Sequence, residues 1–269
     1  MKRLFLPVSL VIVALWAVLQ PESILTFAAP FFSLRKAYTA LTGALALGWM
    51  GLCMVLALRP SWLEQWLGGL DKLYYVHKWT GVAAVLMVVA HWLLVLSPRT
   101  LIAWGWIEAA ARQKRAHGDG FSWIGQGKEV GEWAAWGMVV LGIASLLRFV
   151  PYNWFRKLHK GFPVIFLLGT YHSVTMLWKD QLLATPFGIV LMAVCVAGSI
   201  VAIISLRGTI GASCRHGGRV TRATLDGSGV LELAIAPESS WPGHTEGQFA
   251  LLTLDRGEGA HPFSIVSAW

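Results

Sequence analysis

Charged residues are scarce in this chain: only 13% of its 269 residues are Asp, Glu, Lys or Arg. With 56% hydrophobic residues and 15 tryptophans, the composition is too apolar and too aromatic for a soluble domain of this length. The net charge of +8 comes mostly from short basic stretches beside apolar runs, where lipid headgroups explain it. No basic stripe of the nucleic-acid-binding kind is present, so we expect membrane lipids and no nucleic acid as partners.

Cysteine is also rare, with three residues, Cys53, Cys195 and Cys214, far apart in the sequence. This number and spacing exclude a disulfide framework, a zinc ribbon and a covalent cofactor-attachment motif. Cys53 and Cys195 lie inside apolar runs, so we expect them to be small buried residues.

Long apolar segments dominate the chain as far as Leu206. A helix needs about 20 apolar residues to span the hydrocarbon core. Six segments meet or approach this length: residues 4–20, 37–58, 74–96, 131–148, 160–178 and 186–206. The sequence therefore predicts a mainly α membrane protein, with a six-helix transmembrane bundle as domain 1–206. The first segment is short and follows Lys2 and Arg3, so a signal peptide is the alternative there.

The basic residues favour one orientation in the membrane. If the N-terminus is cytoplasmic, the loops 59–73 and 149–159 and everything after residue 207 are cytoplasmic too, and these stretches hold more Lys and Arg than the opposite side. This predicts a multi-pass protein of the cell membrane, the inner membrane in a bacterium. The outer loop 97–130 contains a predicted amphipathic helix, Ile107–His117, and its role as a cap or a substrate funnel stays open.

After Arg207 the pattern changes to alternation with a period of two. Residues 219–225 and 230–235 alternate on either side of an Asp-Gly turn at 226–229, which predicts a β-hairpin. Residues 248–254 and 261–266 predict two further strands. A second domain, 207–269, is therefore expected to be the beginning of a β-domain.

Four histidines, His77, His91, His159 and His172, lie in the predicted membrane segments or at their ends. An ionisable side chain in a transmembrane helix is costly, so each one is a functional hypothesis. One such histidine could be a hydrogen-bonded polar residue between helices. Two matched pairs are harder to explain in that way.

The spacing of these histidines matches two sites at different depths. His77 and His91 are 14 residues apart, about 21 Å of helix rise, and His159 and His172 are 13 residues apart, about 19.5 Å. The third and fifth segments are parallel in a serial bundle, so His77 should meet His159, and His91 should meet His172. Each pair offers one imidazole to each face of a single iron, as in a b-type haem.

The direction of the side chains is a second test. On an ideal helix, His91 lies within about 40° of His77, but His172 is turned by about 220° from His159. The fifth segment therefore needs a kink or a break, for which Pro163 is a physical reason. A bis-histidine iron has no open axial position, so we expect electron transfer and name no catalytic residue.

A basic cluster follows the fourth segment. Arg148, Arg156, Lys157 and Lys160 could pair with haem propionates, and a role as positive-inside anchors is the alternative.

Three groups of residues resemble a known family. They are Leu70–Gly81 with His91-Trp92, Leu158-His159-Lys160 with Tyr171-His172, and His261-Pro262-Phe263-Ser264. Together they resemble the ferric reductase and NADPH oxidase family, including its bacterial members. In that family, six helices hold two haems, and a cytoplasmic ferredoxin-reductase-like unit provides an FAD-binding β-barrel followed by a nicotinamide-nucleotide domain.

The resemblance implies a transmembrane oxidoreductase. Electrons would pass from NADPH or NADH to FAD, through the two haems, and on to dioxygen or ferric iron on the outer side. It also implies that His261, Pro262, Phe263 and Ser264 lie against the flavin, with residues 247–249 as the preceding barrel strand. An ordinary strand start is the alternative for these four residues.

The sequence also departs from that family. It shows no nicotinamide-binding domain and no glycine-rich phosphate loop, and the barrel stops at Trp269. We therefore expect a fragment of a longer protein that binds haem but binds FAD poorly or not at all, or a chain that takes electrons from a separate partner. Two other functions stay open: a haem-bearing subunit that serves a soluble partner such as a periplasmic methionine sulfoxide reductase, and a cofactor-free transporter with a histidine proton relay.

Overall fold

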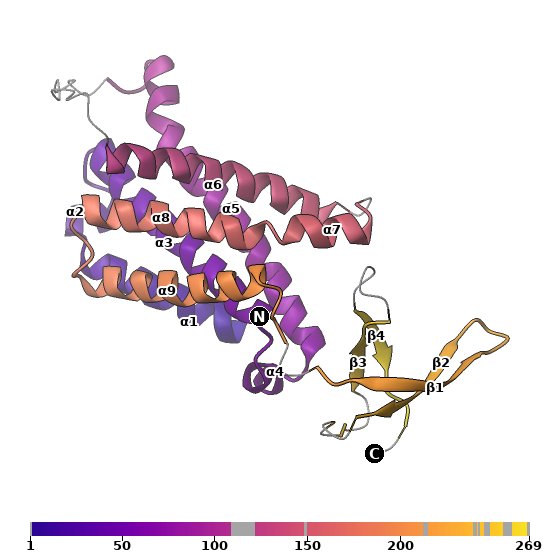
Figure 1. Ribbon diagram of the computed structural model, residues 1–269. Helices are drawn as coiled ribbons and strands as arrows, with labels where there is room; N and C mark the ends of the chain where they lie inside the picture. The colour runs from indigo at the N-terminus through magenta and orange to yellow at the C-terminus, as the bar shows by residue number, and fades with distance from the viewer. Residues whose placement is uncertain are drawn as a thin grey trace. The chain divides into compact units, whose positions relative to one another are not determined.

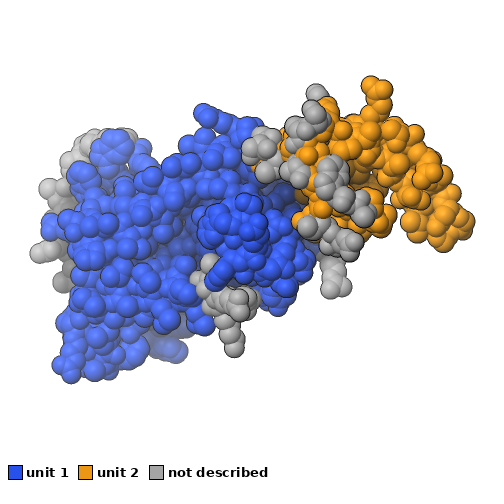
Figure 2. Space-filling view, turned by 90° about the horizontal axis from the view of Figure 1, so that it is seen from below, with its two compact units in different colours: residues 1–210 blue, residues 211–269 orange. Residues whose placement is uncertain are grey.

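The computed structural model describes residues 2–108, 122–147, 150–211, 215–238, 241, 243–244, 248–254 and 260–267. The chain divides into two compact units, Met1–Ile210 and Gly211–Trp269, which Figure 2 shows in different colours. The first unit is helical and the second contains the strands.

The described part of the first unit contains α1 (Lys2–Val18), α2 (Glu22–Leu25), α3 (Phe31–Ala57), α4 (Ser61–Leu67), α5 (Leu70–Ala103), α6 (Trp123–Leu146), α7 (Tyr152–His159), α8 (Phe162–Lys179) and α9 (Pro186–Leu206). Proline sets several of the helix starts, because it disfavours helical backbone in the residue before it and so keeps the helix from extending further toward the N-terminus. Pro30, Pro60 and Pro151 directly precede α3, α4 and α7.

Four of the described stretches are long and apolar enough to cross a membrane: α3, α5, α7 with α8, and α9. α1 is apolar but has only 17 residues. α6 has 24 residues, but its first half contains Lys128, Glu129 and Glu132. All six predicted segments are helical, and the six-span bundle itself stays a prediction.

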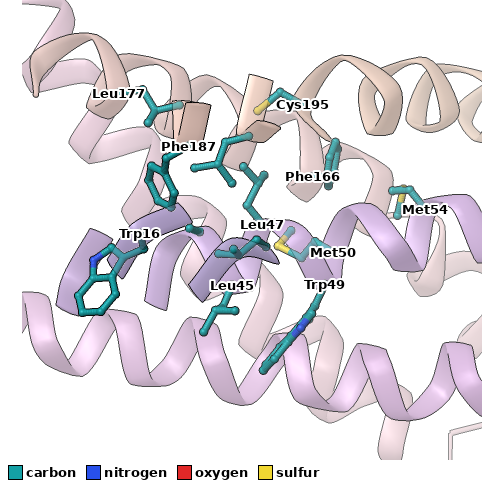
Figure 3. Packing of buried hydrophobic residues seen from close by; sticks show 14 of the residues in the cluster. Trp16, Leu45, Leu47, Trp49, Met50, Met54, Phe166, Leu177, Phe187 and Cys195 are labelled. Carbon is teal, nitrogen blue, oxygen red and sulfur yellow. The ribbon is translucent and has the colours of Figure 1, made fainter. Parts of the chain in front are cut away.

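α3 lies at the centre of the helical unit. It packs against α1, α5, α8 and α9, while α6 packs against α5 and α8 (Figure 1). Figure 3 shows the apolar cluster that fills this centre, including Met50, Phe166 and Cys195. The Phe166 ring lies against Gly198 of α9, where an added Cβ would overlap it, and beside Gly51 of α3. Small residues thus let the three helices approach closely, as is usual in membrane bundles.

The predicted bounds of the outer loop, 97–130, are wrong at both ends, because α5 continues to Ala103 and α6 begins at Trp123. Pro98 lies inside α5 and cannot donate to the Leu94 carbonyl. Arg35 of α3 replaces that donor: its Nε donates to the Leu94 carbonyl over 2.9 Å and its Nη2 to the Val95 carbonyl over 2.8 Å. The Ser97 hydroxyl also donates to the Leu94 carbonyl. The predicted helix Ile107–His117 lies largely outside the described residues.

Replacing Arg35 tests whether it supports α5 at Pro98. We expect Arg35→Met to lower the free energy of unfolding by about 1.5–3 kcal/mol, the usual contribution of a hydrogen bond from a charged group. In a Pro98→Ala background the loss should be smaller, because the restored amide at position 98 can donate to the Leu94 carbonyl. Equilibrium unfolding in detergent measures both. As a control, Lys36→Met removes only the ion pair of an exposed lysine with Asp180 and should cost less than about 1 kcal/mol. Equal losses in both backgrounds would contradict this role.

The second unit confirms the predicted hairpin. β1 (Gly218–Leu225) pairs antiparallel with β2 (Leu231–Pro237). In the turn, Asp226 Oδ1 accepts hydrogen bonds from the Ser228 hydroxyl at 2.6 Å and from the Ser228 and Val230 amides, each at 2.9 Å. These bonds, with the Ser228 hydroxyl first, hold the pKa of the Asp226 carboxyl below its usual value.

The other predicted strands are present as β3 (Phe249–Leu252) and β4 (His261–Ser264), which also pair antiparallel. The described residues thus form two separate two-stranded sheets. A β-barrel stays a prediction.

Candidate functional site

α5 holds two of the four membrane histidines. It is one continuous helix from Leu70 to Ala103, so His77 and His91 are separated by about 21 Å of rise. The two histidines project from nearly the same side of the helix, because their spacing of 14 residues is close to a whole number of turns.

The chain breaks between the other two histidines. His159 is the last residue of α7, Lys160 and Gly161 form a turn, and α8 begins at Phe162. Pro163 lies in the first turn of α8, the position at which a helix tolerates proline. The interruption expected beside Pro163 is present. It removes the conflict in side-chain direction, because α7 and α8 orient their histidines separately.

The structure brings the four histidines together in two pairs. The ring centroids of His77 and His159 are 6.0 Å apart with an interplanar angle of 57°. Those of His91 and His172 are 6.2 Å apart with an angle of 79°. A histidine of α5 therefore faces a histidine of α7 at one depth, and a second histidine of α5 faces one of α8 at another depth.

Backbone carbonyls orient the His91–His172 pair. His91 Nδ1 donates to the Thr39 carbonyl over 3.0 Å, with the Thr42 hydroxyl at 3.3 Å. His172 Nδ1 donates to the Gly127 carbonyl over 2.7 Å. A carbonyl can only accept, so Nδ1 bears the hydrogen and Nε2 keeps the lone pair that a metal needs.

The His77–His159 pair is held more weakly. His159 Nδ1 is 3.4 Å from the Ser145 hydroxyl. His77 Nδ1 is buried and has no hydrogen-bond partner among the described residues. The Cys53 backbone lies near the His77 ring without forming a hydrogen bond to its Nδ1.

These two pairs fit a haem iron. Imidazole nitrogen binds first-row metals at about 2 Å and lies roughly 1 Å in front of the ring centre, so two axial rings have centroids about 6 Å apart. Both measured separations match this value. Within the described residues, no group of three or more His, Cys, Asp or Glu side chains could hold a bare metal ion. A haem needs only two protein ligands, since the porphyrin supplies the others.

The remaining predicted residues are placed as follows. Lys157 lies in the last turn of α7 with its Nζ 5.5 Å from the Trp154 ring centre, and Arg156 lies beside it in the sequence. Arg148, Cys214 and Gly247 lie outside the described residues. Pairing of the basic cluster with propionates stays a prediction.

The four predicted flavin-contacting residues form β4 itself. In its ladder with β3, Ser264 is opposite Phe249 and Phe263 is opposite Ala250. Phe263 is partly buried, and His261, Pro262 and Ser264 are exposed. Their contact with flavin stays a prediction.

Sequence analysis missed the groups that surround the histidine rings. These are Thr39 and Gly43 on α3, and Gly127, Gly131 and Ser145 on α6. One signal was available, because Gly127 and Gly131 have the four-residue spacing at which small residues promote close helix packing.

Comparison with known proteins bears on this arrangement. No curated protein matches the chain. Residues 42–170 match the family model described as "Ferric reductase like transmembrane component". This region includes His77, His91 and His159 and ends two residues before His172. The family, together with the apolar helices, indicates a membrane protein with oxidoreductase activity in general. Residues 42–170 of this chain are therefore similar to the ferric reductase like transmembrane component family.

Proposed function

We propose that the chain conducts electrons across a membrane through two b-type haems, one held by His77 and His159 and the other by His91 and His172. The observation that supports this most directly is the pair of centroid distances, 6.0 and 6.2 Å, each the right width for one six-coordinate iron. When bound, each haem supplies one-electron exchange between ferric and ferrous iron.

The protein residues would position and insulate the two irons. The carbonyls of Thr39 and Gly127 fix the tautomer of His91 and His172, so that Nε2 faces the metal. Two histidines would hold each iron, which would leave no position on the metal for a substrate. Each haem would therefore supply single electrons without binding the acceptor at its iron.

The direction of transfer follows from the proposed orientation. With the basic loops in the cytoplasm, His77 and His159 lie near the inner surface, and His91 and His172 near the outer one. We propose that an NAD(P)H/FAD module on the inner side supplies electrons and that β4, His261–Ser264, lies against its flavin. Dioxygen, giving superoxide, or a ferric chelate would accept electrons outside.

A proton relay is less consistent with the contacts of the histidines. A relay needs hydrogen bonds that lead from one titratable group to the next. In the described residues, His91 and His172 instead donate to helix carbonyls, which cannot pass on a proton, and no carboxylate forms an ion pair with any of the four.

The absorption spectrum of the purified protein tests the proposal. We expect two haems per chain and, on reduction with dithionite, the sharp α-band of a bis-histidine haem. A colourless protein would rule out electron transfer and favour a cofactor-free function. Reoxidation of the reduced protein by air or by a ferric chelate then separates the two acceptors, and failure of both would point to a protein acceptor.

A further inference from the structure

The rings of His91 and His172 are held by the same kind of hydrogen bond, each beside a glycine. Each Nδ1 donates to the carbonyl of a helical residue, Thr39 on α3 or Gly127 on α6, and a glycine follows four residues later. These glycines are Gly43 and Gly131. We call each carbonyl with its glycine a glycine seat.

The glycine is what allows the ring to reach the carbonyl. A Cβ on Gly43 would lie 3.0 Å from His91 Cε1 and 3.1 Å from its Nδ1, closer than most real Cβ contacts. A Cβ on Gly131 would overlap the His172 ring outright. In a helix the amide of residue i+4 points to the carbonyl of residue i, so a side chain there would crowd a ring that approaches that carbonyl.

The other pair has no such seat. Its only hydrogen bond in the described residues is the 3.4 Å contact of His159 with the Ser145 hydroxyl, and His77 Nδ1 has none.

Given the function proposed above, we infer that the two glycine seats hold the iron of His91 and His172 at a lower midpoint potential than the iron of His77 and His159. Donation from Nδ1–H to a carbonyl makes the imidazole a stronger electron donor to its metal. A stronger axial donor stabilises ferric iron more than ferrous iron, which lowers the potential. The iron next to the acceptor is thus the stronger reductant of the two, and a single electron entering the chain resides mainly on the inner iron.

A spectroscopic redox titration tests this inference. The wild type should titrate in two one-electron steps, and the step that remains in His91→Leu, which belongs to the inner iron, should be the more positive. Gly131→Ala should displace the His172 ring and raise the lower potential, by about 59 mV if the ferrous state gains tenfold. Gly43→Ala should raise it less, because His91 needs to move only slightly. Neither change should affect the other step.

Two further variants serve as controls. Gly137→Ala introduces the same change in α6, but its Cβ would meet the aliphatic Ile165 and no histidine, so both potentials should stay unchanged. Ser145→Ala should raise only the inner potential, because it removes the partner of His159.

Each outcome decides the matter. Equal potentials, a more positive outer iron, or an equal shift in Gly137→Ala would overturn the inference. If Gly131→Ala loses the haem of His91 and His172 altogether, the potential of that haem in the milder variant Gly43→Ala tests the inference instead. A wild type without haem would instead refute the proposed function itself, which the spectrum shows before any titration.

Discussion

His91→Leu should leave a folded protein with about half of its haem and no electron transfer to outside acceptors. Leucine has a similar size but no lone pair, so one iron loses an axial ligand while the pair of His77 and His159 stays intact. The two pairs lie about 21 Å apart along α5, too far for the loss of one ring to displace the other. The haem-to-protein ratio and the reduced α-band measure this result.

Complementary variants make the pairing testable. His172→Leu should give the same spectrum as His91→Leu, because both remove ligands of one iron, and the double variant should lose no more haem than either single one. His216→Leu, in the strand-containing unit, should keep both haems. Full retention of haem in His91→Leu, or an additional loss in the double variant, would mean that these two rings do not share an iron.

The histidine pairing was accessible from the sequence because helix rise is uniform. The number of residues between two positions on a helix fixes the difference in depth of their side chains, whatever else surrounds them. The break before α8 was also accessible, since Pro163 restricts the helix locally. Both inferences use only geometry within a few turns.

The features that the sequence did not reveal depend on residues far apart in the chain. α5 runs through Pro98 because Arg35, about 60 positions away, bonds to the Leu94 carbonyl that proline leaves free and to the neighbouring Val95 carbonyl. The seat of His172 likewise requires Gly127, 45 positions earlier. No local pattern predicts which helix will supply such a partner, so the sequence alone overestimates the length of loop 97–130 and does not reveal the glycine seats.

Phe166→Ala should be the most damaging change away from the histidines. Phe166 is 0% exposed and lies on α8 between His159 and His172 in the sequence, packed against Gly198 and near Gly51. Truncating a buried phenylalanine usually costs about 3–5 kcal/mol. In lipid the transfer contribution is small, so the loss comes from the van der Waals contacts and the cavity, and we expect about 3 kcal/mol.

The matched control for this cavity lies two residues away on the same helix. Val164 is 44% exposed, so Val164→Ala should cost less than about 1 kcal/mol. Phe166→Leu, which refills part of the cavity, should fall between the two. Loss of the α-band on heating reports stability, because a loosened α8 releases His172 from its iron. If Phe166→Ala and Val164→Ala lose the α-band at the same temperature, the contact of Phe166 with α3 and α9 contributes little to stability. The histidine contacts would then hold α8 in place.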